Sequence, residues 1–161
     1  MREVMLAYFA GEKQAALALL AAGTLALAAA ALLLLPRWGL RSLGVTLGVF
    51  ALVLLAIGVG LYLRTGPQVD QLQQQLASAA ASFFSEETAR MQRVQRNFVV
   101  IELAELGVII VSAALAIGLK ERPGVVGVAL GLLINATFLL CFDLVAERRG
   151  AVYLEQLLSQ R

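Results

Sequence analysis

Four polar residues stand inside long apolar stretches of this chain and could carry chemistry: Glu102, Glu105, Asn135 and Asp143. Charged side chains in hydrocarbon are costly, so each one marks a candidate functional site by default. Closely spaced carboxylates in a medium of low dielectric constant cannot all be ionised, and at least one would hold a proton. The residue types therefore indicate a candidate proton or cation site inside a membrane.

A structural interpretation of the same residues stays open beside the functional one. Glu102 and Asp143 lie only roughly 8–9 Å along a helix from a flanking arginine, and Glu105 lies deeper. In the structural interpretation Asn135 bonds a neighbouring helix and nearby arginines neutralise the carboxylates, namely Arg93, Arg96, Arg148 and Arg149. In the functional interpretation Glu105 is the central residue, because no basic residue lies within one turn of it.

The residues that the chain lacks exclude whole classes of function. It has no histidine and one cysteine, Cys141. His-ligated metals, bis-histidine haem, histidine general-base catalysis and intramolecular disulfides are therefore excluded within this chain. We expect no cofactor, no metal site and no enzymatic activity. A lipid-modifying enzyme is a weaker alternative, because its carboxylates would have to recruit a metal such as Mg²⁺.

The apolar stretches that hold these residues predict an all-α integral membrane protein. The chain has 161 residues and is 60% hydrophobic, whereas a soluble domain is about 45–50% apolar. A membrane-spanning helix needs about 20 apolar residues. The pattern predicts a single membrane domain over 1–161, a four-transmembrane-helix bundle with spans at about 14–35, 40–63, 97–119 and 125–146.

The less apolar segments predict shorter helices outside the hydrocarbon. Residues 67–96 predict an amphipathic helical joint, with one helix over 67–81 and, after a break at 82–85, a second that begins near Glu86 and continues without a break into the third span. Residues 147–161 predict an interfacial C-terminal helix. Residues 1–13 predict an interfacial lead-in, and 36–39 (Pro-Arg-Trp-Gly) a break after the first span.

Two glycine pairs predict where helices pack closely. Gly44 and Gly48, and likewise Gly127 and Gly131, stand four residues apart on one helix face. Small residues at this spacing let a neighbouring backbone approach.

The basic residues favour both termini and the joint on the cytoplasmic side. Nine lie in the segments assigned to that side: Arg2, Lys13, Arg64, Arg90, Arg93, Arg96, Arg148, Arg149 and Arg161. The two short turns contain four: Arg37, Arg41, Lys120 and Arg122.

Two short stretches, together with the four spans, resemble a known group of proteins. They are Arg90-Met91-x-x-Val94-x-x-Asn97-Phe98 and Asp143-x-x-Ala146-Glu147-Arg148-Arg149-x-x-x-Tyr153-Leu154. The set resembles a family of small, uncharacterised bacterial four-span inner-membrane proteins. The resemblance implies a bacterial source and no particular activity.

Two functional hypotheses follow from the residues. The first is a non-catalytic multi-pass protein of the bacterial inner membrane, an accessory or assembly component that acts through helix–helix contacts as a homo-oligomer or in a larger complex. The second is a homo-oligomeric proton or cation channel or transporter that uses the buried carboxylates. Nothing in the sequence indicates a nucleic-acid partner, and the lipid bilayer is the expected surroundings.

Overall fold

Four long helices make up the regular structure of the described residues. The computed structural model describes residues 1–35 and 39–160. The helices are α1 (Arg2–Leu33), α2 (Arg41–Ser78), α3 (Ala80–Gly118) and α4 (Pro123–Ser159). Most of the expected break at 36–39, and Arg161 at the C-terminus, lie outside the described residues.

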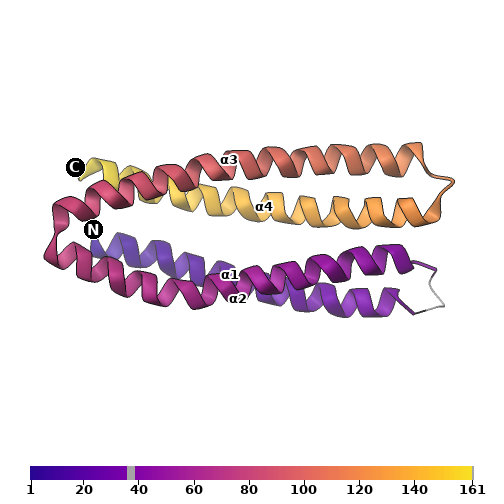
Figure 1. Ribbon diagram of the computed structural model, residues 1–161, viewed down its shortest axis with the longest axis horizontal. Helices are drawn as coiled ribbons and strands as arrows, with labels where there is room; N and C mark the ends of the chain where they lie inside the picture. Colours follow the sequence, from indigo (N-terminus) through magenta and orange to yellow (C-terminus); the bar gives the residue numbers. More distant parts are fainter. Residues whose placement is uncertain (36–38, 161) are drawn as a thin grey trace.

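Consecutive helices run antiparallel to each other, and they pair as two hairpins. α1 packs mainly against α2 and α3 against α4, and the hairpins meet chiefly through α2 and α4. Both termini and the α2–α3 connection lie at one end of the molecule, which we call the core end (Figure 1). The α1–α2 and α3–α4 connections lie at the opposite end, which we call the loop end (Figure 1).

All four helices are long and apolar enough to cross a membrane. They contain 32 to 39 residues, which corresponds to roughly 48–58 Å at 1.5 Å per residue. The hydrocarbon core of a bilayer is about 30 Å thick. Each helix therefore exceeds the span, and its excess lies toward the core end, where the sequence is less apolar.

The expected joint over 67–96 is helical and its second helix continues into the third span as predicted, but its first helix is not separate from the second span. α2 continues through Pro67 to Ser78, and α3 begins at Ala80, so Ala79 alone forms the connection. The proline removes one backbone hydrogen bond, but the helix continues because Thr65 and Leu72 on either side of it are buried. The expected break at 82–85 is absent because Phe83 packs into the core as part of α3.

The expected interfacial segments at both termini are also parts of longer helices. Residues 147–159 continue α4, and Tyr153 and Leu157 on them are buried. α1 begins at Arg2, and its residues Met5 and Phe9 are buried as well. Their apolar side chains pack on one another rather than facing headgroups, which explains why these segments do not lie flat at an interface.

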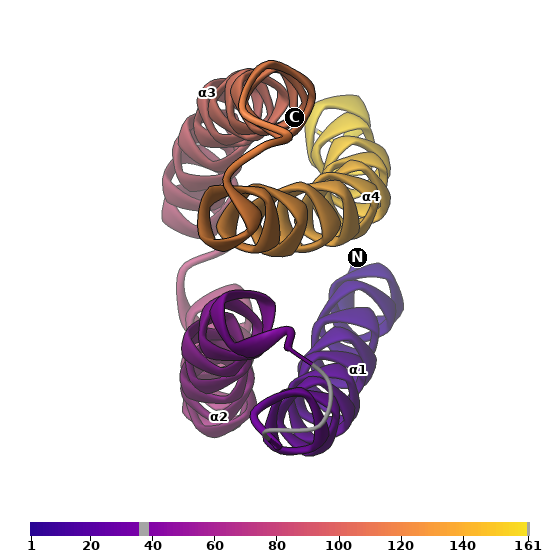
Figure 2. The same cartoon turned by 90° about the vertical axis from the view of Figure 1, so that its right-hand side faces the viewer.

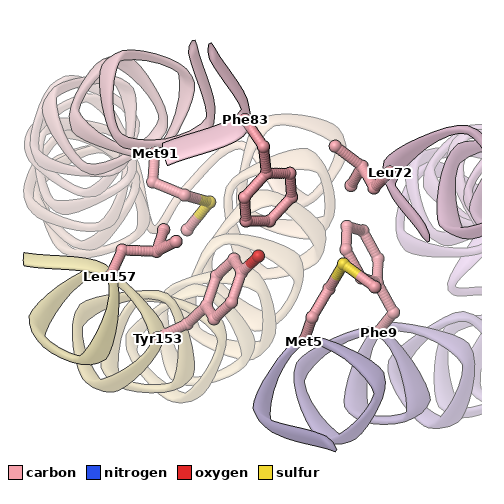
Figure 3. Packing of buried hydrophobic residues seen from close by; sticks show 7 residues of the cluster. All are labelled: Met5, Phe9, Leu72, Phe83, Met91, Tyr153 and Leu157. Atoms are coloured by element: carbon pink, nitrogen blue, oxygen red, sulfur yellow. The ribbon is translucent and has the colours of Figure 1, made fainter. Parts of the chain in front are cut away.

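The core end encloses a hydrophobic cluster to which every helix contributes. Figure 3 shows its side chains converging from the four helices. The buried members are Met5, Phe9, Leu72, Phe83, Met91, Tyr153 and Leu157. This end is therefore a small four-helix bundle with a core of its own, in the manner of a water-soluble bundle.

A repeated motif aligns α1 with α2 in the apolar half. The sequence A-L-x-L-L-A-x-G occurs at 16–23 and again at 51–58. A Cβ added at Gly23 would lie 2.9 Å from Leu55 Cγ, and one added at Gly58 would lie 2.9 Å from Leu20 Cγ. Each glycine thus receives the leucine of the other copy, so the two helices pack with near two-fold symmetry.

The glycine pairs singled out from the sequence lie at two different contacts. Gly44 and Gly48 lie against α1, where both approach Ala30. Gly127 and Gly131 lie against α2, where they meet Ser42 and Thr46. The second contact joins the two hairpins near the loop end. Seen along the long axis, α2 and α4 lie between α1 and α3 at this end (Figure 2).

We predict that Gly58→Leu destabilises the α1–α2 hairpin and that Gly60→Leu does not. A Cβ at Gly58 would lie 3.1 Å from the Ala16 carbonyl oxygen, whereas a Cβ at Gly60 would meet nothing within 4 Å. Overpacking costs about 1–3 kcal/mol, and leucine at an open helical position gains up to about 1 kcal/mol over glycine. Reversible unfolding in mixed detergent micelles measures both variants. Equal effects would contradict the assigned contact.

Candidate functional site

The two hairpins separate between the core end and the Gly127–Gly131 contact, and a cavity of about 320 Å³ lies there. All four helices line it. Its wall toward the loop end is apolar and includes Leu19, Ile57 and Ile101. Its wall toward the core end is polar, and the side chains there are Tyr8, Glu12, Arg64, Arg90, Asn97 and Arg149, while Asp143 lies at about the level of Ile57 and Ile101.

A buried ion pair closes the core end of this cavity. Glu87 is only 2% exposed, and both its oxygens accept hydrogen bonds from the Arg90 guanidinium at 2.7 Å. Tyr153 donates a third bond to Glu87 Oε1, at 3.1 Å. A buried carboxylate is tolerated only when it is paired and hydrogen-bonded, so this arrangement fixes α4 against α3.

Aromatic rings extend the same network to α1. The Tyr8 and Tyr153 rings stack with centroids 4.6 Å apart, and the Arg90 guanidinium lies 5.8 Å from the Phe9 ring centroid. Burial, and then the anionic Glu12, raise the pKa of Tyr8 well above its usual value, and burial and Glu87 do the same to the pKa of Tyr153. Burial alone would lower the pKa of Arg90. The hydrogen bond and the charge of Glu87 outweigh burial and raise this pKa above its usual value. Both phenols therefore stay neutral donors beside a permanent cation.

A second set of polar contacts joins α1 to α2 and to α4. Glu12 accepts a bond from Thr65 Oγ1 at 3.4 Å, and its carboxylate lies 4.0 Å from Arg64. Arg149 donates from Nη1 to the carbonyl oxygen of Gly11. The buried Nε of Arg149 has no hydrogen-bond partner within the described residues. This donor is therefore enclosed by the chain and unsatisfied among the described residues.

The four polar residues predicted from the sequence do not form one site. Asp143 lines the cavity, and it interacts electrostatically with Glu102 and Glu105, which lie outside the cavity in the α3–α4 hairpin. Asn135 is buried and donates to the Gly131 carbonyl of its own helix at 2.7 Å, so it is not part of the carboxylate group. Among the described residues no cluster of acidic and cysteine side chains could hold a metal ion.

The arginines expected to neutralise the carboxylates do not reach them. Among the described residues the ion pairs are Arg64–Glu12 and Arg90–Glu87. Arg93, Arg96 and Arg148 are exposed on their helices. Glu102 Oε1 and Glu105 Oε2 are buried and have no hydrogen-bond partner in the described part of the chain. One oxygen of each carboxylate is therefore enclosed by the chain without a donor among the described residues.

The cavity residues contributed by α1, and the buried Glu87 that binds Arg90, were not predicted from the sequence. Residues 1–13 read as an interfacial lead-in, yet Met5, Tyr8, Phe9 and Glu12 recur at the three-to-four-residue spacing of one helix face. That spacing was the available signal. On α3 the structure pairs Arg90 with Glu87 at i,i+3 spacing.

The described residues form an all-helical fold whose four helices are each long and apolar enough to span a membrane, as expected of a multi-pass membrane protein. No match to the chain is found among protein-family models, curated proteins or solved structures. Its function has therefore to be argued from its own geometry.

We predict that Glu87→Gln destabilises the protein strongly and that Glu86→Gln does not. The substitution at Glu87 leaves Arg90 without its anion. Because the Arg90 side chain is 30% exposed, we expect about 3 kcal/mol, near the low end for breaking a buried ion pair. Glu86 is exposed, and its substitution should stay within about 0.5 kcal/mol. Chemical unfolding in detergent compares the two, and a similar loss for both would refute the assigned pair.

We predict that Tyr8 and Tyr153 do not ionise in the folded protein near pH 10. Because their folded pKa values lie above the unfolded value of about 10, their contribution to stability is complete below pH 10 and is lost as the pH rises further. Phenolate absorbance at alkaline pH measures this. Tyr8→Phe and Tyr153→Phe should leave the amplitude between pH 9 and pH 11 unchanged, and a decrease for either variant would contradict the assignment.

Proposed function

We propose that this chain is a non-catalytic accessory or assembly subunit of a membrane complex, and that it binds its partner through the apolar half of α3. The observation that carries the proposal is the pair Glu102 and Glu105. Both side chains are half-exposed in the apolar half of α3, and one carboxylate oxygen of each is buried without a donor from the described residues.

The apolar half of α3 has little cover from its own chain. Only 6% of its most apolar stretch is buried, against 22–28% for the other three helices. Ser112 is the one buried residue there. Lipid covers apolar side chains such as Leu103 and Val111, but it offers no donor to Glu102 or Glu105. An unsatisfied polar group in hydrocarbon costs several kcal/mol, so these two carboxylates favour a protein neighbour.

The charge of the face indicates the chemistry of that neighbour. A transmembrane helix with an arginine, a lysine or an amide donor at the depth of Glu102 and Glu105 would satisfy both carboxylates. A second copy of the chain using the same face would bring four carboxylates together, and like charges at close range repel. A different membrane subunit therefore fits this face better than a second copy.

The placement in the cell is part of the same proposal. We place the apolar halves of the helices in the membrane and the core end in the cytoplasm. The excess of arginine and lysine in the segments at the core end supports this orientation. A bacterial inner membrane is the proposed location.

A homo-oligomeric proton or cation channel or transporter is the second candidate. Its support is the electrostatic grouping of Glu102, Glu105 and Asp143 in the α3–α4 hairpin. Four spans are few for a monomeric transporter, so a pathway would need several copies.

Native mass spectrometry of the chain gently extracted from its own membrane tests the proposal. We expect a stoichiometric foreign membrane subunit, which is lost in the double variant Glu102→Gln, Glu105→Gln and is retained in Glu155→Gln. A monodisperse monomer would contradict the proposal. A discrete homo-oligomer whose proton flux in liposomes disappears on Glu105→Gln would establish the second candidate instead.

A further inference from the structure

The cavity between the hairpins has its mouth on one side of the molecule. Its exposed lining residues belong only to α2 and α3, and they are Ile57, Arg64, Asn97 and Ile101. The residues that α1 and α4 contribute, such as Leu19 and Asp143, are buried or half-buried. α1 and α4 therefore form the inner wall, and the opening lies between α2 and α3, which contact each other little.

The mouth changes from apolar to polar along the helix axes. Ile57 and Ile101 stand toward the loop end and are 48% and 44% exposed. Arg64 and Asn97 stand toward the core end, roughly 6–10 Å away along their helices. A bilayer shows the same gradient where its hydrocarbon meets its headgroups. The opening is thus matched to an amphiphile that enters sideways from the membrane.

The charges on the wall are mixed rather than of one sign. Arg64 and Arg149 present guanidinium groups, which suit a phosphate. Glu12 and Asp143 present carboxylates in the same cavity, and these would repel a purely anionic headgroup. Arg90 is already engaged by Glu87 through two hydrogen bonds. A ligand with one anionic and one cationic group satisfies this wall best.

We propose that the cavity binds the headgroup of a zwitterionic aminophospholipid. Arg64 and Arg149 bind the phosphate, and Glu12 and Asp143 accept hydrogen bonds from the primary ammonium. The acyl chains leave between Ile57 and Ile101 into the bilayer. The cavity volume of about 320 Å³ is at the low end for ligand pockets. It therefore suits a headgroup and the first part of its acyl chains. This site is separate from the α3 face and does not depend on its partner.

The experiment is a lipid titration followed by native mass spectrometry. The full chain is purified in mild detergent, delipidated and titrated with dioleoyl phosphatidylethanolamine, phosphatidylcholine or phosphatidylglycerol. We expect one tightly bound phosphatidylethanolamine per chain. Phosphatidylcholine should bind more weakly, because its quaternary ammonium cannot donate to Glu12 or Asp143. Phosphatidylglycerol should bind more weakly because the same carboxylates repel it.

Matched variants assign the binding to this cavity. Arg64→Gln and Arg149→Gln should each weaken phosphatidylethanolamine binding about tenfold, the effect of one lost charge-assisted hydrogen bond. Arg148→Gln, next in sequence but outside this cavity, should leave it unchanged. Arg64 is exposed, so its variant is expected to fold even if Arg149→Gln does not. Tighter binding of phosphatidylglycerol than of phosphatidylethanolamine, or equal weakening by Arg64→Gln and Arg148→Gln, would overturn the proposal.

Discussion

The ion pair between Glu87 and Arg90 sets the arrangement of the core end. A carboxylate that is 2% exposed must keep all its hydrogen bonds, since each lost bond leaves a desolvated charge. Arg90 supplies two of them and Tyr153 the third. Tyr153 in turn stacks on Tyr8 of α1. The requirement of one buried group thus fixes three helices relative to one another, and Leu72 of α2 joins them through the hydrophobic cluster.

The apolar half depends on a different kind of contact. In lipid there is no hydrophobic force between helices, so close backbone approach has to provide the attraction. Gly23 and Gly58 provide it within the first hairpin, and Gly127 and Gly131 between the hairpins. The cavity lies between these glycine contacts and the core end, where neither kind of packing fills the space. Its position follows from the change of packing along the helices.

Much of this architecture can be predicted from the sequence. The four apolar stretches and their order follow from composition and length, because a helix that crosses a bilayer needs a long uninterrupted apolar run. The extent of the helices could not be predicted in the same way. Pro67, and Ser85 followed by Glu86, are ordinary local signals for the start of a helix. The tertiary packing of Leu72 and Phe83 overrides both signals. Local rules cannot show this, since the residues that override them come from other helices.

The candidate site was predicted only in part for the same reason. Charge inside an apolar run identifies Asp143, which lines the cavity. It does not identify Glu12, Arg90 or Arg149, which stand at the ends of the runs and read as ordinary flanking charges. Asn135 shows the opposite case, because its depth suggested a role while its amide is satisfied by the preceding turn of α4. The partner of a polar side chain, rather than its depth, decides its role.

We propose that the core end is a folded bundle outside the membrane while the apolar half of α3 lies within it. Reaction of single cysteines with a water-soluble maleimide, in nanodiscs that leave both faces open, tests this most directly. Gln74→Cys and Glu155→Cys, both exposed at the core end, should react rapidly. Leu103→Cys and the native Cys141, both exposed in the apolar half, should not react until the protein is transferred to detergent. Protection of the first two positions, or rapid reaction of the last two, would contradict the account.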